Sequence, residues 1–185
     1  RVRTQLVSGE FFAVLGVRAV VGRVFGPEED RAPGAGPVAV ASYGFWQREF
    51  AGRPEMLGTA ITVGKGVFQI IGVTPPGFHG VIVGSDPDLW FPITMQAQVL
   101  PGRDYLKPRD TLWLHAMGRL APGISRQAAE SAINVAWQQV LQSWASGLPT
   151  SKERRGTLDQ RIELRPGARG ASELRGSFAD PLGLL

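Results

Sequence analysis

The 185-residue sequence contains no cysteine, and this absence excludes several kinds of function. Disulfide frameworks, thiolate metal sites, redox dithiols and cysteine nucleophiles all need the thiol side chain. Histidine is also scarce, since only His79 and His115 could act as bases or imidazole ligands near neutral pH. The two are far apart in sequence and form no helical ligand pair, so we interpret both as structural residues.

The sequence also lacks a long apolar run. A bilayer crossing takes about 20 apolar residues, and the two uncharged windows, 66–85 and 131–151, are broken by prolines, glycines and His79 or by Asn and Gln. With 43% hydrophobic and 19% charged residues, the composition is that of a globular chain. We therefore expect one compact unit or two small lobes.

Lysine is rare, because 17 of the 20 basic residues are arginine. The net charge is +4, and much of the excess lies in 152–175, where basic and acidic residues alternate. Interleaved signs are typical of a solvated face rather than of a nucleic-acid site. We expect no nucleic-acid partner.

Motifs for catalysis or cofactor binding are missing. The nearest approach to a phosphate-binding loop, Gly58 to Lys65, has five residues instead of four between its glycines, and Gly66 replaces the magnesium-binding hydroxyl. No serine has the two flanking glycines of a nucleophile elbow. The carboxylates at Asp86, Asp88 and 28–30 lack the spacing of a calcium loop. The sequence therefore predicts no catalytic residue, cofactor or metal, and no enzyme.

Hydrophobic periodicity predicts a mixture of short strands and helices. Strands or extended pieces are expected at 2–7, 17–25, 37–41, 59–63, 67–73, 81–83, 88–91, 111–120 and 158–164. Helices are expected after Ser8, Ser42 and Ser125, each serine acting as an N-cap. The longest helix carries Trp137 and Trp144 on an apolar stripe that we expect to face the core. The strands that flank it would complete a strand-helix-strand unit.

One loop is unusual because it is apolar and uncharged. It runs from Pro75 to Gly84, and uncharged apolar loops often contact a partner. Packing under a neighbouring lobe is the alternative. The candidate partner-contact residues are Pro75, Pro76, Phe78, Val81 and Ile82.

Five sequence blocks follow one another along the chain: VSGEFFAVLGVRAVVGRVFGPEED, PVAVASYGFWQREFAG, LGTAITVGKGVFQIIGVTPPGF, DLWFPI and LHAMGRLAPGISRQAAESAI. In this order they resemble the MacB-like periplasmic core domain. That domain is the extracytoplasmic insert between the first two transmembrane helices of MacB/FtsX-type ABC transporter permeases. The resemblance covers roughly residues 1–165.

The resemblance implies an α+β fold with two lobes. A porter-like split βαβ lobe would be formed by both chain ends, residues 1–30 and 105–170, and a smaller β-rich lobe would be inserted at 36–95. Residues 171–185 would form a tail leading toward a membrane helix. The strands near 2–7 and 158–164 would then belong to one lobe, and the Pro75 to Gly84 loop would lie away from the membrane.

The resemblance also implies a non-catalytic function. The domain would sit on the periplasmic side of the bacterial inner membrane and couple ATP hydrolysis, by a cytoplasmic ABC ATPase subunit or domain, to the handling or export of a substrate. A periplasmic adaptor or cargo is the expected partner there. Both chain ends would run into membrane helices, with Arg1, Arg3, Arg169 and Arg175 near the head groups. A stand-alone extracytoplasmic ligand-binding domain is the alternative, and a hydrolase with an unrecognised site a more distant one.

Overall fold

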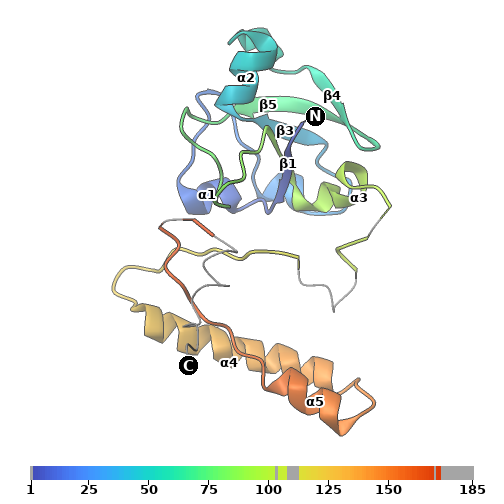
Figure 1. Ribbon diagram of the computed structural model, residues 1–185, viewed down its shortest axis with the longest axis vertical. Coiled ribbons are helices and arrows are strands. Elements are labelled where there is room, and N and C mark those ends of the chain that lie inside the picture. The colour runs from blue at the N-terminus through green and yellow to red at the C-terminus, as the bar shows by residue number, and fades with distance from the viewer. Residues whose placement is uncertain (1, 103, 108–112, 169, 172–185) are drawn as a thin grey trace, which may run out of the picture. The chain divides into compact units, whose positions relative to one another are not determined.

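The structure is a computed structural model that describes residues 2–102, 104–107, 113–168 and 170–171. It divides into two compact units (Figure 1). Unit 1 comprises residues 1–117 and 170–185, and unit 2 comprises residues 118–169.

Unit 1 is built on a mixed sheet with the strand order β1-β6-β3-β5-β2, and β4 pairs with β5 beside this path. Its strands are β1 (Thr4–Val7), β2 (Val21–Gly22), β3 (Val38–Ala41), β4 (Ala60–Val63), β5 (Gly66–Val73) and β6 (Leu89–Pro92). The pairs β1/β6 and β3/β5 are parallel, whereas β3/β6, β2/β5 and β4/β5 are antiparallel. The predicted α+β class is confirmed.

The central strand β3 shows how this sheet separates two apolar clusters. Successive side chains of a strand point to opposite faces. Ala39 and Ala41 belong to one cluster, together with Phe45 of α2 (Tyr43–Phe50), whereas Val40 belongs to the other, together with Phe12 of α1 (Phe11–Leu15). The two short helices therefore contribute to the apolar clusters of opposite faces of the sheet.

Local capping signals place α2 where the sequence predicts it. The Ser42 hydroxyl accepts a hydrogen bond from the main-chain N–H of Phe45 at 3.0 Å. The prediction for α1 is only half right. Gly16 ends that helix with φ 70°, but Ser8 is not the cap, because Glu10 occupies the N-cap position without a side-chain cap bond.

The strand predicted over 17–25 shrinks to the two residues of β2 because Gly22 turns the backbone to φ +70°. Gly22 pairs with Gly72 of β5, and a Cβ on Gly72 would lie 2.0 Å from the carbonyl oxygen of Arg23. Glycine is needed at both positions for the two strands to approach.

Two stretches in which the sequence predicts no helix contain short helices. Within 26–37, residues Pro27–Asp30 form a 3₁₀ helix, and its Asp30 carboxylate accepts hydrogen bonds from the main-chain N–H groups of Gly9 (2.9 Å) and Thr94 (3.0 Å). Beyond β6, a 3₁₀ turn (Ile93–Met95) leads into α3 (Gln96–Val99). The acidic turn Pro27–Asp30 therefore connects the segments around Gly9 and Thr94 within unit 1 through the Asp30 carboxylate.

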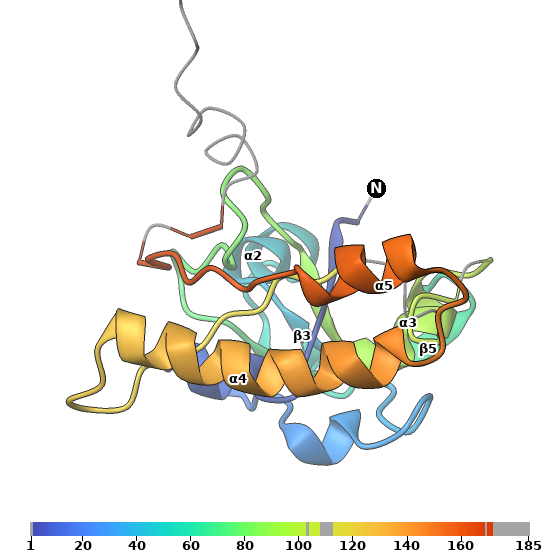
Figure 2. The same ribbon diagram turned by 90° about the horizontal axis from the view of Figure 1, so that it is seen from below.

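Unit 2 contains α4 (Arg126–Ala145) and α5 (Ser151–Leu158), which lie side by side (Figure 2). Ser125 caps α4 as predicted, accepting a hydrogen bond from the N–H of Ala128 at 3.1 Å. Leu141 is fully buried, but Trp137 and Trp144, packed edge to face with ring centroids 5.4 Å apart, are only half-buried. The tryptophan stripe is less buried than the sequence predicts.

The predicted strands at 111–120 and 158–164 are not formed in the described residues. Residues 113–120 are extended coil without a ladder, so His115 does not lie on a strand, and α5 extends to Leu158. Alternation specifies a strand only where a neighbouring strand is present to pair with it. The split βαβ arrangement is therefore not formed in the part of the chain that the structure describes.

The observed units also differ from the predicted lobes. β1, from the range 1–30, pairs with β6, from the range 36–95, so these two ranges share one sheet. Residues 158–164 belong to unit 2, whereas the strand near 2–7 belongs to unit 1. Of the expected tail 171–185, only Ala171 lies in the described residues.

Candidate functional site

The uncharged loop connects β5 to β6 and is anchored by one aromatic side chain. The ring of Phe78 packs against Trp90 (5.4 Å between centroids), Phe11 (6.3 Å) and Phe12 (6.4 Å). Among the predicted contact residues, Pro76 is exposed, whereas Pro75, Val81 and Ile82 are half-buried. Phe78 is therefore half-buried against the apolar cluster of unit 1 that contains Phe12 and Trp90.

The second half of the loop is bonded to a distant part of its own chain. Ile82 forms a parallel bridge with Ala171. The N–H of Ala171 donates to the carbonyl of Val81 at 2.6 Å, and the N–H of Val83 donates to the carbonyl of Ala171 at 2.9 Å. The main chain of 81–83 is therefore bonded within unit 1, although the Val83 side chain is 54% exposed.

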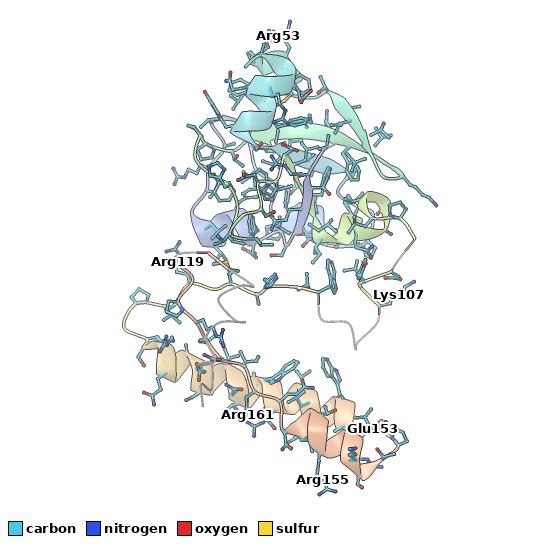
Figure 3. The ribbon with its side chains drawn as sticks, viewed as in Figure 1. Arg53, Lys107, Arg119, Glu153, Arg155 and Arg161 are labelled. Carbon is cyan, nitrogen blue, oxygen red and sulfur yellow. The ribbon has the colours of Figure 1, made fainter. Side chains whose placement is uncertain are left out.

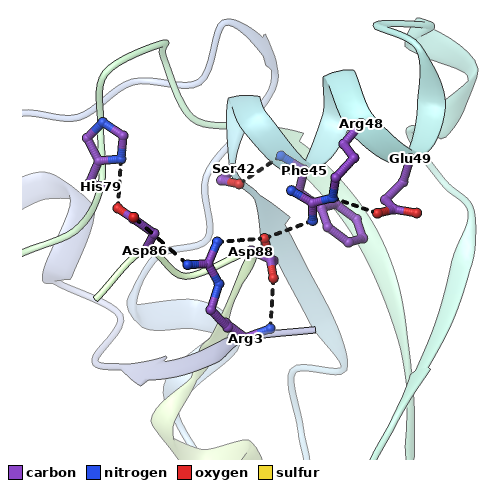
Figure 4. A network of polar contacts seen from close by, with 8 residues as sticks. All are labelled: Arg3, Ser42, Phe45, Arg48, Glu49, His79, Asp86 and Asp88. Carbon is purple, nitrogen blue, oxygen red and sulfur yellow. Dashed lines mark hydrogen bonds and ion pairs between the residues drawn. The ribbon is translucent and has the colours of Figure 1, made fainter. Parts of the chain in front are cut away.

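Polar contacts connect His79 of the loop to Asp86 and, through Asp86, to Arg3 (Figure 4). Nδ1 of His79 lies 2.9 Å from a carboxylate oxygen of Asp86, and the other oxygen of Asp86 lies 3.9 Å from the Arg3 guanidinium. These side chains are more than half exposed, so each pair contributes little to stability.

Asp88 is the centre of the same network, and its side chain is only 3% exposed. The carboxylate accepts hydrogen bonds from the main-chain N–H of Arg3 at 2.8 Å, the Arg48 guanidinium at 3.0 Å and the Arg3 guanidinium at 3.4 Å. Burial alone would raise the pKa of Asp88, but the hydrogen bonds from Arg3 and Arg48 outweigh it and the pKa is lowered. Asp88 thus ties β1, α2 and the start of β6 together.

A cleft of about 580 Å³ lies over this network. Its lining combines four charged side chains with an apolar wall: Val2, Arg3, Phe45, Arg48, Glu49, Phe50, Ile61 and Asp88. The charges are paired with one another, since Arg48 bonds Glu49 at 2.8 Å as well as Asp88, and its guanidinium lies 5.6 Å from the Phe45 ring centre. Among the described residues, no three His, Asp or Glu side chains are grouped closely enough to hold a metal ion.

The expected membrane-proximal arginines can be compared with the structure at one position only. Arg1, Arg169 and Arg175 lie outside the described residues. Arg3 is described, and its guanidinium pairs with Asp86 and Asp88 within unit 1. Arg48 and the role of Asp88 were not predicted from the sequence, because Arg3 and Arg48 are 85 and 40 residues from Asp88.

Comparisons with known proteins agree with the resemblance in the sequence. The family model described as "MacB-like periplasmic core domain" matches residues 1–136. No curated protein matches the chain significantly. Within the described residues, no helix has the length and hydrophobicity needed to cross a bilayer.

Three solved structures are similar to the chain. The periplasmic region of MacB from Actinobacillus actinomycetemcomitans is 15% identical with a TM-score of 0.51, over 74% of this chain and 56% of that one. A domain of a putative permease from Porphyromonas gingivalis is 18% identical with a TM-score of 0.46, over 88% and 65%. The extracellular domain of the transporter YknZ from Gram-positive bacteria is 17% identical with a TM-score of 0.41, over 52% and 46%.

The chain thus spans little more than half of the MacB periplasmic region, with which it shares its fold. The family match covers well over half of the chain, and it includes β1 to β6 and the whole Asp88 network. The chain therefore belongs to the MacB-like periplasmic core domain family, the extracytoplasmic domains of MacB/FtsX-like ABC transporter permeases.

Proposed function

We propose that this chain is the non-catalytic module by which an ABC permease couples ATP hydrolysis in the cytoplasm to the handling or export of a substrate outside the membrane. The observation that supports coupling is the attachment of two distant segments to one stretch of chain. The carbonyl of Arg3 accepts hydrogen bonds from the N–H groups of Asp88 and Leu89, and Ala171 pairs with Ile82. A displacement of either segment would be passed to residues 81–89.

The partners follow from the same proposal. A cytoplasmic ABC ATPase subunit or domain would supply the energy, and a periplasmic adaptor or cargo would meet the exposed part of the Pro75 to Gly84 loop. Arg1, Arg169 and Arg175 would lie near anionic head groups, each contributing about 1 kcal/mol close to the surface. In the whole domain, 111–120 and 158–164 would gain strand partners and complete the porter-like lobe.

The alternative, a stand-alone ligand-binding domain, needs polar groups that are free to orient a ligand. In the cleft of unit 1, both arginines already bond carboxylates of the same chain. This pairing favours a structural network over a ligand site.

The 185-residue chain is expected not to bind ATP. It has no glycine-rich phosphate loop with the required lysine and hydroxyl, so calorimetry at micromolar protein should record no binding heat. Magnesium-ATP titrated into the partner ATPase serves as the positive control. Micromolar affinity, about 8 kcal/mol, would reveal a phosphate site and contradict the non-catalytic assignment.

Coupling is tested by locking the two attached segments in the full-length permease. Ile82→Cys with Ala171→Cys introduces a pair into a domain that has no other cysteine, and paired strand neighbours lie about 4.8 Å apart, within reach of a disulfide. If these segments move during the ATPase cycle, oxidation should slow ATP hydrolysis in proteoliposomes by about 5-fold or more, and reduction should restore it.

The two single-cysteine variants control for side effects of each substitution. Their ATPase rates should not respond to oxidation. An oxidised double variant that hydrolyses ATP at the wild-type rate would argue against movement at this bridge.

A further inference from the structure

Asp88 lies directly before β6, and each of its polar groups bonds another segment of unit 1 (Figure 4). Its N–H donates to the carbonyl of Arg3 at 2.8 Å, and its carbonyl accepts from the N–H of Ser42 at 2.9 Å. Its two carboxylate oxygens accept from the N–H of Arg3 (2.8 Å) and from the guanidinium group of Arg48 (3.0 Å). Asp88 is therefore a junction of segments that are far apart in the sequence.

The junction holds the N-terminal segment on both sides of one Cα atom. The N–H of Arg3 donates to the carboxylate of Asp88, and the carbonyl of Arg3 accepts from the N–H groups of Asp88 and Leu89 (3.2 Å). Both main-chain groups of Arg3 are thus used, and each lies in a planar peptide unit. The backbone at Arg3 therefore cannot slide along β6 without breaking these bonds.

The junction also holds α2 at two separate points. The N–H of the N-cap residue Ser42 donates to the main-chain carbonyl of Asp88, and Arg48 reaches the carboxylate from the other half of the helix. Since a helix rises 1.5 Å per residue, the two attachments lie about 9 Å apart along its axis. The guanidinium group of Arg48 also lies 5.6 Å from the ring centre of the buried Phe45, within the range of a cation–π contact. Two separated attachments oppose both sliding and tilting of α2.

We propose that Asp88 and Arg48 join the N-terminal segment, α2 and the start of β6 into one cooperative unit, in which α2 moves with the N-terminal segment. The proposed function passes a displacement of the N-terminal segment to residues 81–89, and the junction extends this path to α2. That movement rests on the proposed function, whereas the cooperative unit does not require it. Arg48 is the positioning residue, because its side chain carries the second attachment of the helix.

A hinge at Ser42 is the competing arrangement. One residue separates β3 from α2, and hinges are formed by a few residues at the ends of such elements. With the Ser42 bond alone, α2 would tilt about its first turn against no more than the packing of Phe45 and Trp46 in the core. The Arg48 bond opposes this tilt, because breaking it removes a donor from a carboxylate that is only 3% exposed.

Arg53 offers a comparison near the same helix. It follows the C-terminal end of α2, and its exposed side chain lies at the outer end of unit 1 (Figure 3). Its Nε donates to the carbonyl of Phe50 at 3.2 Å, so its contact is local. Arg53 and Arg48 thus carry the same charge near the same end of α2, but of these two only Arg48 bonds Asp88.

Hydrogen exchange of single main-chain amides in the 185-residue chain, followed by NMR, tests the proposal. The amides of Arg3 and Ser42 are the reporters, because each donates to Asp88. Arg48→Gln should accelerate exchange at both reporter amides by about fivefold, since a hydrogen bond to a charged group is lost, although its donor is half exposed. Equal acceleration at both is the mark of one cooperative opening.

Arg53→Gln is the matched control, because it removes the same charge near the same helix without touching the junction. It should leave both reporter amides unchanged. The amides of Gly9 and Thr94 donate to a different carboxylate of unit 1 and serve as internal references. They should keep their rates in Arg48→Gln, because a local opening leaves other parts of a fold closed.

Acceleration at Ser42 without acceleration at Arg3 would overturn the proposal, because α2 would then open by itself. Unchanged rates at both reporter amides would also overturn it, since core packing alone would then hold the helix. Equal acceleration at the reference amides would contradict it too, because Arg48 would then support unit 1 as a whole. The measurement needs no ATPase cycle, so it can fail while the disulfide lock at 82 and 171 still slows ATP hydrolysis, and the proposed function then stands without α2.

Discussion

Replacing Phe12 by Ala is expected to destabilise unit 1 by about 3–5 kcal/mol, the range for a large aromatic side chain lost from a core. Phe12 is fully buried and packs edge to face against Phe25 (5.2 Å) and Trp90 (6.3 Å). It also contacts the ring of Phe78, which anchors the loop. The substitution therefore opens a cavity and removes the surface on which the Pro75 to Gly84 loop rests. Urea denaturation followed by circular dichroism measures the loss.

Phe11→Ala is the matched control, because it makes the same change one residue earlier on α1, where the ring is only half-buried. Its cost should be clearly smaller, since less apolar area leaves water there. Equal losses for the two variants would show that α1 does not insert Phe12 between the sheet and the loop.

Elements with complete local signals could be predicted from the sequence. Ser42 provides a cap acceptor three residues before Phe45, and the β4/β5 hairpin turns at Gly64, whose φ is +60°. These signals depend on residues that are close together in the sequence, so they can be recognised from the sequence alone. Gly16 at the end of α1 belongs to the same class.

Elements that depend on distant partners could not be predicted. The alternation in 158–164 is typical of a strand, but the neighbour of this segment in unit 2 is a helix, and the amides of Asn134 and Gln138 take the place of a strand ladder. Likewise, the length of β2 is set by the meeting of Gly22 with Gly72, which are 50 positions apart in the sequence. Sequence periodicity shows which side of a strand or helix is apolar, but it does not show which other element packs against or pairs with that element.

The candidate site, like the fold, could be predicted only where its signal is local in the sequence. The absence of charge marked the Pro75 to Gly84 loop, but no local pattern shows that Phe78 turns inward or that Ala171 pairs with Ile82. The role of Asp88 could not be predicted from its neighbours in the sequence, because its three hydrogen-bond donors come from two distant arginines. Buried polar groups need such partners, so a carboxylate directly before the apolar run Leu89-Trp90-Phe91 was the one available signal.

Asp88→Asn is expected to lower the stability of unit 1 by about 2 kcal/mol at pH 7, the value typical of hydrogen bonds to a charged group. The asparagine keeps the shape of the side chain, but it loses the charge and one acceptor oxygen in a site that is only 3% exposed. The Arg3 and Arg48 guanidinium groups are about half exposed and can turn to water, which limits the loss. Chemical denaturation of both proteins at pH 7 measures the difference.

The difference should depend on pH in a defined direction. The pKa of Asp88 in the folded state lies below its ordinary value of about 3.9, so the carboxylate stabilises the fold above that value and loses this contribution as the pH falls through the folded-state pKa. The stability gap between wild type and Asp88→Asn should therefore be full at pH 7 and close in strong acid. Glu29, whose pKa is lowered as well despite its desolvation, is present in both proteins, and its contribution cancels in the difference.

Asp86→Asn supplies the matched control, since Asp86 also pairs with Arg3 but is 56% exposed. Its effect at pH 7 should be below about 1 kcal/mol, as for other exposed pairs. Equal effects of the two substitutions would mean that Asp88 is not the buried junction of β1, α2 and β6. A gap for Asp88→Asn that persists unchanged into strong acid would mean that its cost comes from altered packing, because protonation removes the charge of the wild-type carboxylate.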